Sequence, residues 1–431
     1  PRQRMVVTRM RPFKLRAYFF GGGKMNVIDI LEERGFIDQM THEEELRDLL
    51  EKEKVKFYIG FDATADSLTL GHFLQIRVMQ HMQNAGHIPV ALLGGGTTMI
   101  GDPSGKNDMR KVMTEDFINH NAECFRKQIS HFLDFSEGKG IIENNKDWLL
   151  DLKFLPFMRE IGVHFSVNRM LNFDCYKNRM ERGLTFFEFG YMLMQSYDFL
   201  YLYRKHGVKL ELGGSDQWSN IIGGYELVRK LESDLVFGMT FKLLTTASGQ
   251  KMGKSEKGAI WLDRDKTSPY EMFQYLRNCD DRDVIKFLKL LTMLPLEKIA
   301  EYEKLEGQEL NKAKEALAFE VVKDVHGEEA AKEALEASKA LFQGGADSDN
   351  IPNEDMDRKI FEEGIGILDL MTKLNLTKSN SEARRLIQGG GVSIDGEKVQ
   401  DPNLVVKADM FTDDKLILQK GKKVHQRITL V

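Results

Sequence analysis

The chain has 431 residues, of which 42% are hydrophobic and 29% charged, and its net charge is −5 at pH 7. This length and composition predict about three folded domains and exclude a disordered or fibrous protein. No segment approaches the roughly 18 apolar residues of a membrane span. The three cysteines, Cys124, Cys175 and Cys279, form no disulfide or metal motif. We therefore expect no membrane association and a reducing, cytoplasmic location.

Basic residues concentrate at the two ends of the chain. Residues 1–24 contain seven Lys or Arg and no acid, and residues 364–431 contain eleven Lys or Arg against eight Asp or Glu. This distribution suggests that a polyanionic partner is bound partly by an appendage. We interpret residues 1–24 as a leader outside the fold, produced by over-extended translation before a start at Met25. A transit peptide is the alternative interpretation.

The body alternates strand-like and helical segments. Apolar spacing from Asn26 predicts a first helix with Ile28, Leu31, Phe36 and Ile37 at candidate apolar positions. The next elements predicted are strands at 56–61 and 87–93 with a helix at 70–84 between them, then a strand at 208–212 and a helix at 216–231. Strand, helix, strand units of this kind are typical of a parallel sheet that binds ligands at the carboxyl ends of its strands.

The last third of the chain changes character. Residues 269–342 have a helical pattern rich in Glu, Lys, Ala and Leu, and residues 344–357 are polar, acidic and glycine-rich, which is typical of a linker. The tail that follows predicts two short helices and then short strands near 389–391 and 395–396. We detect no internal repeat.

The first motif with chemical content is the segment 58–72, which reads YIGFDATADSLTLGH. Gly60 could let a ligand approach the backbone, and Asp66 or Ser67 could cap the helix whose first turns contain Gly71 and His72. The free N–H groups of a helix start suit a nucleotide phosphate. An ordinary capped helix is the simpler interpretation.

The second motif is the segment 94–106, which reads GGGTTMIGDPSGK. A glycine-rich loop after an apolar strand fits phosphate or a close backbone approach, with Asp102 supplying a carboxylate. It lacks the ending of a Walker loop, and a structural turn would explain it equally well.

The third motif places Tyr191, Gln195 and Asp198 on one helical face, and the segment LGGSDQW follows at 212–218. A solvated polar face fits poorly among neighbours such as Phe187, Phe189 and Phe199. Buried polar groups need partners, so a bound polar ligand is the sharper interpretation.

The fourth motif is KMGKS at 251–255, in a stretch that follows Ser248 and Gly249. Two lysines around a glycine could fold over a polyphosphate and neutralise charge as it leaves. Taken alone, the segment could equally be a basic surface loop.

In this order the four motifs resemble class I aminoacyl-tRNA synthetases, and among these the bacterial-type tyrosyl-tRNA synthetases, over residues 25–431. TLGH stands where the family has HIGH, and KMGKS stands where it has KMSKS. The patterns YxGFDxTADSLxxGH, GDPSGK and GGSDQW are specific in combination. The tail segment LTKSNSEARRLI at 376–387, with the glycines that follow it, resembles the S4 RNA-binding domain.

The resemblance implies an α/β fold: a Rossmann-like parallel-sheet catalytic domain, then an α-helical domain and a small α+β S4-like domain. The boundaries implied are 25–245 for the catalytic domain, 246–268 for the KMSKS-type loop, 269–343 for the helical anticodon-binding domain, 344–361 for a linker and 362–431 for the S4-like domain. A homodimer is implied as well.

The resemblance further implies a two-step reaction. L-Tyrosine attacks the α-phosphate of ATP to give tyrosyl-adenylate and pyrophosphate, and the tyrosyl group then passes to the 3′-terminal adenosine of tRNA(Tyr). Mg²⁺ would bind through the phosphates of ATP, with no dedicated protein metal site. Catalysis would rest on positioning and on stabilising the charge of the leaving pyrophosphate.

Site residues follow by resemblance, position by position. Tyr58 and Asp198 match the pair that binds the substrate phenol. The rest of the implied tyrosine site is Asp102, Tyr191, Gln195 and Gln217. The implied nucleotide and adenylate site is Gly60, Asp62, Gly71, His72, Gly214, Asp216 and Lys254. The implied catalytic groups are Thr64, His72, Lys106, Arg110, Lys251 and Lys254. The tRNA contacts implied in the tail are Lys378, Arg384 and Arg385.

Two positions depart from the family pattern. Thr69 occupies the first histidine position of HIGH, which in the family helps to hold the γ-phosphate beside Thr64. Our hypothesis is that the enzyme is active and that its lysines and arginine compensate. Glu211 stands where many relatives have glutamine near the substrate, and the sequence supplies no account of it.

Three alternatives stay open from the sequence alone. The tryptophanyl sister enzyme is disfavoured by Tyr58, Asp198 and the S4-like tail. An RNA-binding or splicing-assisting protein that lost catalysis has Thr69 in its favour and the retained motif lysines against it. A general nucleotidyl transferase on the same fold would not need the phenol pair.

Overall fold

The structure is a computed structural model that describes residues 19–20, 23–24, 26–102, 113–181, 183–255, 258–342, 351–421 and 424–431. The chain divides into two compact units, Pro1–Lys266 with Ile285–Glu303, and Thr267–Val284 with Lys304–Val431. Of the leader, the described parts are β1 (Phe19–Phe20) and β2 (Gly23–Lys24), which pair antiparallel. None of the described helices is both long and apolar enough to cross a bilayer.

The first unit is built on a six-stranded sheet with the order β3-β8-β7-β4-β5-β6. Only the edge pair β3 and β8 is antiparallel. The chain leaves β4 for β5 on one side and later returns to β7 on the other, so the topological switch point lies at β4. The strands are β3 (Ile37–Met40), β4 (Lys56–Phe61), β5 (Ile88–Leu93), β6 (Ile141–Asn144), β7 (Leu210–Gly214) and β8 (Phe237–Phe241).

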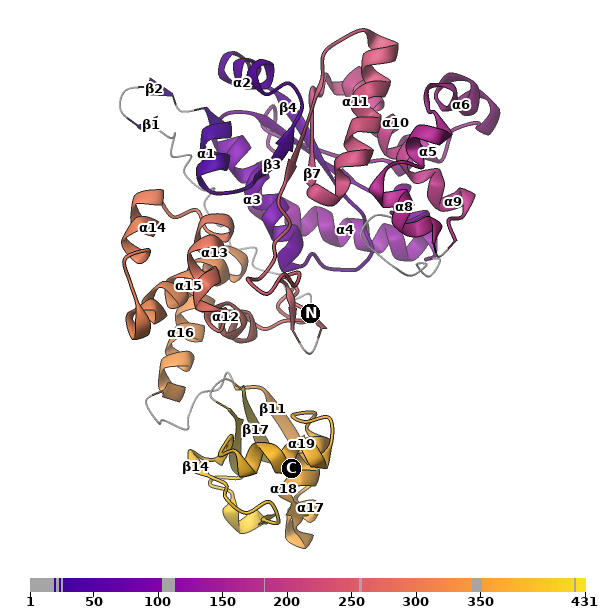
Figure 1. Cartoon of the computed structure of the whole chain (residues 1–431). Helices are drawn as coiled ribbons and strands as arrows, with labels where there is room; N and C mark the ends of the chain where they lie inside the picture. Colours follow the sequence, from indigo (N-terminus) through magenta and orange to yellow (C-terminus); the bar gives the residue numbers. More distant parts are fainter. Residues whose placement is uncertain are drawn as a thin grey trace, which may run out of the picture. The chain divides into compact units, whose positions relative to one another are not determined.

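Crossover connections between parallel strands place helices on both faces of this sheet, as is usual for this topology. Helices α3 and α4 contact each other and β5, whereas α10 packs on α11, which contacts β7 and β8 (Figure 1). The helices of this layer arrangement are α1 (Val27–Glu33), α2 (Glu43–Lys52), α3 (Leu70–Asn84), α4 (Glu115–Phe132), α10 (Tyr191–His206) and α11 (Trp218–Glu232). Five short helices connect β6 to α10: α5 (Lys146–Leu149), α6 (Phe154–Glu160), α7 (Val167–Met170), α8 (Asp174–Met180) and α9 (Phe186–Phe189).

The sequence-based expectations hold well in this unit. β4 and α3 have the predicted bounds, and β5 begins one residue later than predicted. β7 begins two residues later than predicted and extends through the two glycines, and α11 likewise begins two residues later, at Trp218. The first helix is confirmed as α1, which Asn26 caps by accepting a hydrogen bond from the Ile28 N–H. Of its predicted apolar positions, Ile28 and Leu31 lie on α1 and are buried. Phe36 and Ile37 lie beyond the end of the helix at Glu33, with Ile37 at the start of β3, so their assignment to the helix was wrong.

The segment of α13 (Val284–Leu291) and α14 (Leu296–Tyr302) was expected in the helical domain, but residues 285–303 belong to the first unit. Two buried arginines explain this. Arg34 donates to the carbonyls of Lys289, Thr292 and Leu294, and Arg77 donates to that of Leu291. Both guanidinium groups therefore satisfy the free carbonyls at the end of α13.

The second unit begins with a helical part formed by α12 (Pro269–Arg277), α15 (Leu310–His326) and α16 (Glu328–Phe342), which contact one another. Ser268 and Glu271 form a capping box at the start of α12, with Pro269 at its first position. These are the sequence features that favour a helix start there.

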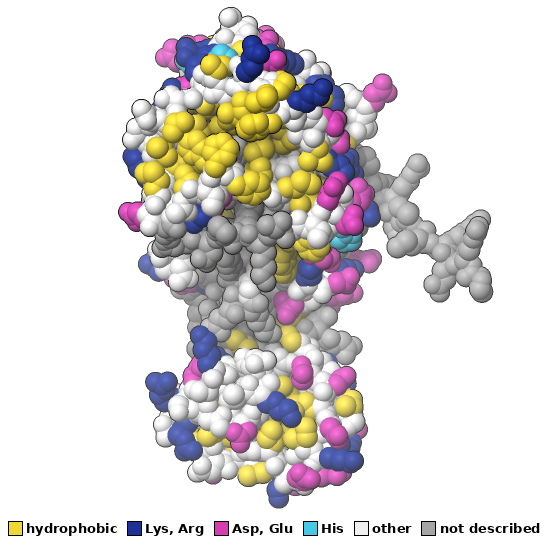
Figure 2. All heavy atoms as spheres, turned by 90° about the vertical axis from the view of Figure 1, so that its right-hand side faces the viewer, with side chains coloured by type: hydrophobic (Ala, Val, Ile, Leu, Met, Phe, Trp, Pro, Cys, Tyr) yellow, Lys and Arg dark blue, Asp and Glu magenta, His cyan; other side chains and the backbone are white. Residues whose placement is uncertain are grey.

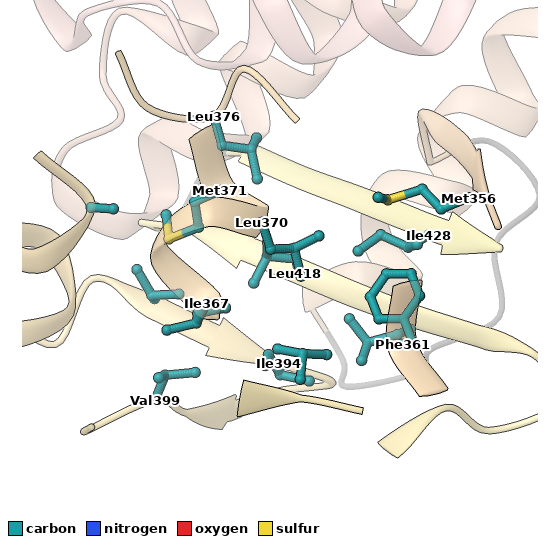
Figure 3. Packing of buried hydrophobic residues seen from close by; sticks show 14 of the residues in the cluster. Met356, Phe361, Ile367, Leu370, Met371, Leu376, Ile394, Val399, Leu418 and Ile428 are labelled. Atoms are coloured by element: carbon teal, nitrogen blue, oxygen red, sulfur yellow. The ribbon is translucent and has the colours of Figure 1, made fainter. Parts of the chain in front are cut away.

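The tail of the second unit has a sheet with the order β11-β17-β16-β13-β14. Phe361, Ile367, Leu370, Leu418 and Ile428 contribute to its hydrophobic core (Figure 3). Its helices are α17 (Arg358–Glu363), α18 (Ile367–Lys373) and α19 (Asn380–Gln388). Its strands are β11 (Asn353–Met356), β12 (Ile365–Gly366), β13 (Val392–Ile394), β14 (Glu397–Lys398), β15 (Val405–Val406), β16 (Lys415–Lys420) and β17 (Val424–Leu430).

Part of the segment predicted as a linker is ordered with this tail. β11 lies within residues 344–361 and pairs in parallel with β17, from Asn353 opposite Arg427 to Met356 opposite Leu430. Residues 343–350 lie outside the described ranges. Backbone pairing with the last strand is a long-range contact, so the local composition of the segment gave no sign of it.

Candidate functional site

A pocket of about 380 Å³ opens at the carboxyl ends of β4, β5 and β7, beside the switch point of the sheet. Most of the predicted tyrosine and nucleotide residues line it, although they come from segments up to 159 residues apart in sequence, from Tyr58 to Gln217. The predicted residues that line the pocket are Tyr58, Gly60, Asp62, Thr64, His72, Asp102, Tyr191, Gln195, Asp198, Gly214, Asp216 and Gln217.

Asp198 lies on α10 and is fully enclosed at one end of this pocket. Its Oδ1 accepts a hydrogen bond from Trp148 Nε1 at 2.7 Å, and its Oδ2 accepts one from Asn145 Nδ2 at 2.9 Å. Burial raises the pKa of Asp198 to about 8, while these two hydrogen bonds act in the opposite direction. The carboxyl is therefore held in a fixed orientation by neutral donors.

Tyr58 lies on β4 with its ring packed against Phe199, the centroids 5.5 Å apart. Burial raises the pKa of its hydroxyl well above the usual value, and the neighbouring carboxyls of Glu211 and Asp198 add to the effect. The phenol of Tyr58 therefore stays neutral and can both donate and accept a hydrogen bond.

Glu211, to which the sequence analysis assigned no role, is buried and lines the same pocket. It lies directly opposite Tyr58 in the parallel pairing of β4 with β7. Its Oε1 accepts a hydrogen bond from Gln195 Nε2 at 3.0 Å. Burial raises the pKa of Glu211 to about 7, and the neighbouring polar groups of Gln195 and Tyr58 act in the opposite direction.

Beyond these groups, acidic side chains with amide and hydroxyl donors surround the middle of the pocket. The Tyr191 hydroxyl donates to Asp62 Oδ2 at 3.1 Å, and Gln217 Nε2 donates to Asp102 Oδ2 at 2.6 Å. Asp62 also accepts from Thr97 Oγ1 at 2.8 Å. Carboxylates oriented in this way suit a positively charged group such as an ammonium.

His72 and Thr69 form the start of α3 where it faces the pocket. The N–H of Thr69 donates to His72 Nδ1 at 3.0 Å, and the Thr69 hydroxyl lies 3.0 Å from the same nitrogen. Because Nδ1 accepts from the backbone, the neutral ring carries its proton on Nε2. The replacement of the first HIGH histidine by threonine thus keeps the second histidine oriented.

The glycines of the site have two different roles. A Cβ on Gly94 would lie 2.3 Å from Asp62 Oδ1, and one on Gly95 would lie 2.3 Å from Asn144 Oδ1, so this loop needs glycine for close packing within the protein. A Cβ on Gly60 would meet nothing within 4 Å, although Gly60 lines the pocket. The space beside Gly60 is therefore open, and its use by a ligand stays a prediction.

The predicted phosphate-binding groups are only partly described. Lys251 is exposed, and its Nζ lies 3.9 Å from Asp216 Oδ2, which brings it next to the pocket. Lys254 starts the short strand β9 (Lys254–Ser255), which pairs with β10 (Gly258–Ala259), and its side chain lies outside the description. Lys106 and Arg110 lie in residues 103–112, also outside the described ranges.

Gly71 and the tail residues lie elsewhere. Gly71 is in the first turn of α3 beside His72, and a Cβ there would be 3.6 Å from Thr69 Oγ1, which is ordinary contact. Lys378 precedes α19, and Arg384 and Arg385 lie on it; all three are exposed in the second unit.

Sequence reasoning missed Asn145 and Trp148, the two donors that orient Asp198. Asn145 also accepts from the N–H of Gly96 at 2.7 Å and donates to Thr97 Oγ1 at 3.0 Å, so it links the glycine loop to the carboxyl. A signal was available, because Asn144 ends β6 and Asn145 follows it directly. Polar residues at the carboxyl end of a parallel strand are candidates for a site.

Among the described residues, no group of three or more His, Cys, Asp or Glu is close enough together to hold a metal ion. The cysteines all fall within the described ranges, and each has a free thiol.

Comparisons with known proteins show the family of the chain. The profile of class I tRNA synthetases (W and Y) matches residues 50–343, and that of the tyrosine–tRNA ligase SYY-like C-terminal domain matches residues 346–428. The tyrosine–tRNA ligase of Acetivibrio thermocellus is 57% identical over 94% of this chain and all of its own length. That of Lachnoclostridium phytofermentans is 59% identical over 93% and 98%.

A solved structure gives the same result for the fold. A C-terminally truncated mitochondrial tyrosyl-tRNA synthetase from Aspergillus nidulans superposes with a TM-score of 0.67 at 30% identity, over 75% of this chain and 95% of that one. These relatives carry the names tyrosine–tRNA ligase and tyrosyl-tRNA synthetase, which decides against the tryptophanyl alternative. The chain therefore belongs to the tyrosine–tRNA ligases, a family of ATP-dependent class I aminoacyl-tRNA synthetases.

Proposed function

We propose that the pocket at β4, β5 and β7 activates L-tyrosine with ATP and then passes the tyrosyl group to tRNA(Tyr). The observation that carries this proposal is the arrangement of the pocket: a buried Tyr58 and Asp198 pair at one end, and a helix start with His72 and the KMGKS segment next to the other. An amino acid and a nucleotide bound end to end would bring the carboxylate of the first to the α-phosphate of the second.

Tyr58 and Asp198 would recognise the substrate phenol by hydrogen bonds. The phenol can donate to Asp198 and accept from Tyr58, whereas phenylalanine would leave both buried groups without a partner. Penalties of this kind are the established basis of amino-acid discrimination in tyrosyl-tRNA synthetases as a class. Trp148 and Asn145 support the pair, because they fix the Asp198 carboxyl by hydrogen bonds of 2.7 and 2.9 Å.

The middle of the pocket would hold the charged end of the amino acid and the adenylate. Asp102, Tyr191 and Gln195 would surround the ammonium group, and Gln217 would lie near the carboxylate. Asp216 would bind the ribose and Asp62 the adenylate. Gly60, Gly71 and Gly214 would allow the nucleotide to approach the backbone, and the open space at Gly60 supports this assignment.

Catalysis would then depend on stabilising the leaving pyrophosphate. His72 can donate a hydrogen bond from Nε2. Lys251 lies next to Asp216, so its ammonium group could bind a phosphate at this end of the pocket. Thr64, Lys106, Arg110 and Lys254 are the other groups proposed for this task. Mg²⁺ would reach the site on the phosphates of ATP and neutralise part of their charge.

Binding of tRNA(Tyr) is proposed for the second unit. Lys378, Arg384 and Arg385 are exposed around α19, whose other face is held in the core by Ala383 and Ile387. Basic side chains on a rigid helix suit the phosphates of structured RNA. We assign this reaction to the cytoplasm, because the similar curated relatives are bacterial.

A homodimer is proposed through an apolar patch on the first unit. Large hydrophobic side chains on and around α6 and α9 are exposed, with Phe186 at 72% and Leu155 at 71%. Figure 2 shows a broad group of hydrophobic side chains on this side of the molecule. Exposed patches of this kind usually mark an interface between proteins. The exposed residues are Leu150, Phe154, Leu155, Val163, Val167, Met180, Phe186 and Phe187.

Amino-acid-dependent exchange of pyrophosphate into ATP tests the proposal directly. We expect exchange with tyrosine and none above background with phenylalanine or tryptophan. No exchange with any amino acid, from a folded protein that still binds tRNA, would support the alternative of an RNA-binding protein without catalysis. Exchange with an amino acid that lacks a phenol would remove the assigned role of Tyr58 and Asp198.

A further inference from the structure

Two polar atoms meet in the wall of the tyrosine pocket without completing a hydrogen bond. In the part of the chain that the structure describes, neither the Tyr58 hydroxyl nor Glu211 Oε2 has a hydrogen-bond partner of ordinary geometry, although both are buried. The two residues are opposite each other in the pairing of β4 with β7, and their side chains interact. Buried polar atoms without a partner are rare in folded proteins, so this pair in the wall of a ligand pocket calls for a functional explanation.

The other carboxylate oxygen of Glu211 is already used. Oε1 accepts from Gln195 Nε2, so Oε2 is the atom left to face Tyr58. The backbone of α11 closes the space behind it, since a Cβ on Gly224 would lie 3.1 Å from Oε2. Glu211 therefore cannot turn away from Tyr58 toward solvent.

We propose that Glu211 is a positioning residue for tyrosine specificity, the end of a hydrogen-bond chain that runs from Glu211 through Tyr58 and the substrate phenol to Asp198. This inference rests on the proposed binding of the tyrosine phenol between Tyr58 and Asp198. Each of the two hydroxyl groups in the chain can donate once and accept once, so the chain has two possible directions.

Every link of this hydrogen-bond chain is formed when Glu211 and Asp198 hold one proton between them. If Glu211 holds it, Glu211 donates to Tyr58, Tyr58 donates to the phenol, and the phenol donates to Asp198. If Asp198 holds it, every bond reverses. With no proton, Tyr58 donates to Glu211 and the phenol donates to Asp198, so the two hydroxyl oxygens face each other without a hydrogen between them.

The surroundings support a shared proton. The titratable groups that face the pair are Tyr58 on β4, Tyr191 on α10 and Asp62 after β4. From α5, Asp198 meets the neutral Trp148 and, just before that helix, the neutral Asn145; from α11, Glu211 meets the backbone at Gly224. No cation among the described residues forms a salt bridge with either carboxyl, and burial raises the pKa of both.

The test is the pH dependence of the tyrosine KM in pyrophosphate exchange, between pH 6 and 9, for the full chain and for Glu211→Gln. The amide of the variant can accept from Gln195 and donate to Tyr58 at every pH, so it imitates the protonated Glu211. We expect the KM of the parent protein to rise about tenfold from pH 7 to pH 9 as the shared proton leaves. Because the KM of Glu211→Gln should not rise, the ratio of its KM to that of the parent should fall by the same factor from pH 7 to pH 9.

Two further variants complete the design. Glu226→Gln is the matched control, since Glu226 pairs with Arg169 at the surface and should leave the alkaline rise intact. Tyr58→Phe interrupts the hydrogen-bond chain and leaves both carboxyls unchanged, so this variant should also lose the alkaline rise in KM. It provides the test if Glu211→Gln does not fold. An identical alkaline rise in the parent, Glu211→Gln and Tyr58→Phe would overturn the inference. Absence of any tyrosine-dependent exchange in the parent would instead overturn the proposed function.

Discussion

Two carboxyls buried in one pocket make the folded chain bind protons more tightly than the unfolded chain does. The pKa of Asp198 rises to about 8 and that of Glu211 to about 7, from ordinary values near 4. Their contribution to stability is therefore fully present below about pH 4 and is lost as the pH rises through about 7 to 8. The two carboxyls therefore lower the free energy of unfolding most at neutral and alkaline pH, where the enzyme acts.

Glu211→Gln should therefore stabilise the protein only at neutral and alkaline pH. The amide cannot ionise, so at pH 8 the variant avoids a cost on the order of 2 to 3 kcal/mol that the parent protein bears. Urea denaturation at pH 8 and at pH 4.5 measures the difference in the free energy of unfolding. A gain of the same size at both pH values would mean that packing, and not ionisation, is responsible.

The two kinds of glycine in the site predict opposite results. Gly60→Val places its side chain in open space in the pocket, so we expect unchanged thermal stability and a KM for ATP raised by about tenfold or more. Gly94→Ala forces Asp62 to move and should lower stability instead. Melting temperatures and exchange kinetics of both variants check this, and a large loss of stability in Gly60→Val would contradict the assignment.

Individual residues were predictable where a motif named their chemistry and unpredictable where only contact gives them a role. Tyr58, Asp102, Tyr191 and Asp198 were identified from motifs and do line one pocket. Asn145 was missed because its role depends on reaching Asp198, which is 53 residues away in sequence. Glu211 was noticed as a departure, but its meaning required the register of β4 against β7.

At the scale of elements, the start of α3 carries the main departure from the family pattern. Thr69 holds His72 through two contacts of 3.0 Å to Nδ1. Placing a second histidine at this position would add a donor for phosphate and remove the threonine hydroxyl from the helix cap.

We therefore expect Thr69→His to change the exchange rate less than about threefold and to cost about 1 kcal/mol of stability, the usual value for a lost cap. Pyrophosphate exchange at saturating tyrosine and a denaturant titration measure the two effects. A rate gain of tenfold or more would show that the lysines and arginine of the site do not compensate for the missing histidine.

Elements were predicted well where the signal is local. The bounds of β4 and α3 follow from apolar runs and helical spacing. The association of α13 with the first unit could not be predicted in this way, because it depends on two buried arginines more than 200 residues earlier in the chain. The pairing of β11 with β17 is a similar case of backbone contact between distant segments.

At the scale of the whole molecule, the apolar patch predicts assembly. Phe186→Asp and Leu155→Asp put charges on side chains that are 72% and 71% exposed, so the folded subunit loses little. In a dimer the same charges would be buried without partners. Light scattering on a sizing column should show a dimer for the parent and a monomer for the double variant, with similar circular dichroism. A parent that is monomeric at micromolar concentration would contradict the proposed homodimer.

The tyrosine pocket and the tail lie in different units, so we expect amino-acid activation and tRNA binding to be separable. The tail after residue 350 has its own sheet and core, and its exposed Lys378, Arg384 and Arg385 lie outside the tyrosine pocket. A chain ending at Phe342 keeps α16 and removes β11 together with its partner β17. We expect tyrosine-dependent exchange within about twofold of the parent and charging of tRNA lowered at least a hundredfold, since phosphate contacts supply most of the affinity for RNA.

Substitution of the three basic residues by glutamine separates binding from folding in that experiment. The triple variant keeps the tail and should weaken tRNA binding while flattening its dependence on salt, because each lost phosphate contact lowers the number of counterions released. The affinity for tRNA between 50 and 200 mM salt is the measurement. Equal loss of exchange and charging in the truncated chain, together with an unchanged salt slope in the triple variant, would mean that the tail supports the fold of the enzyme and does not hold its RNA.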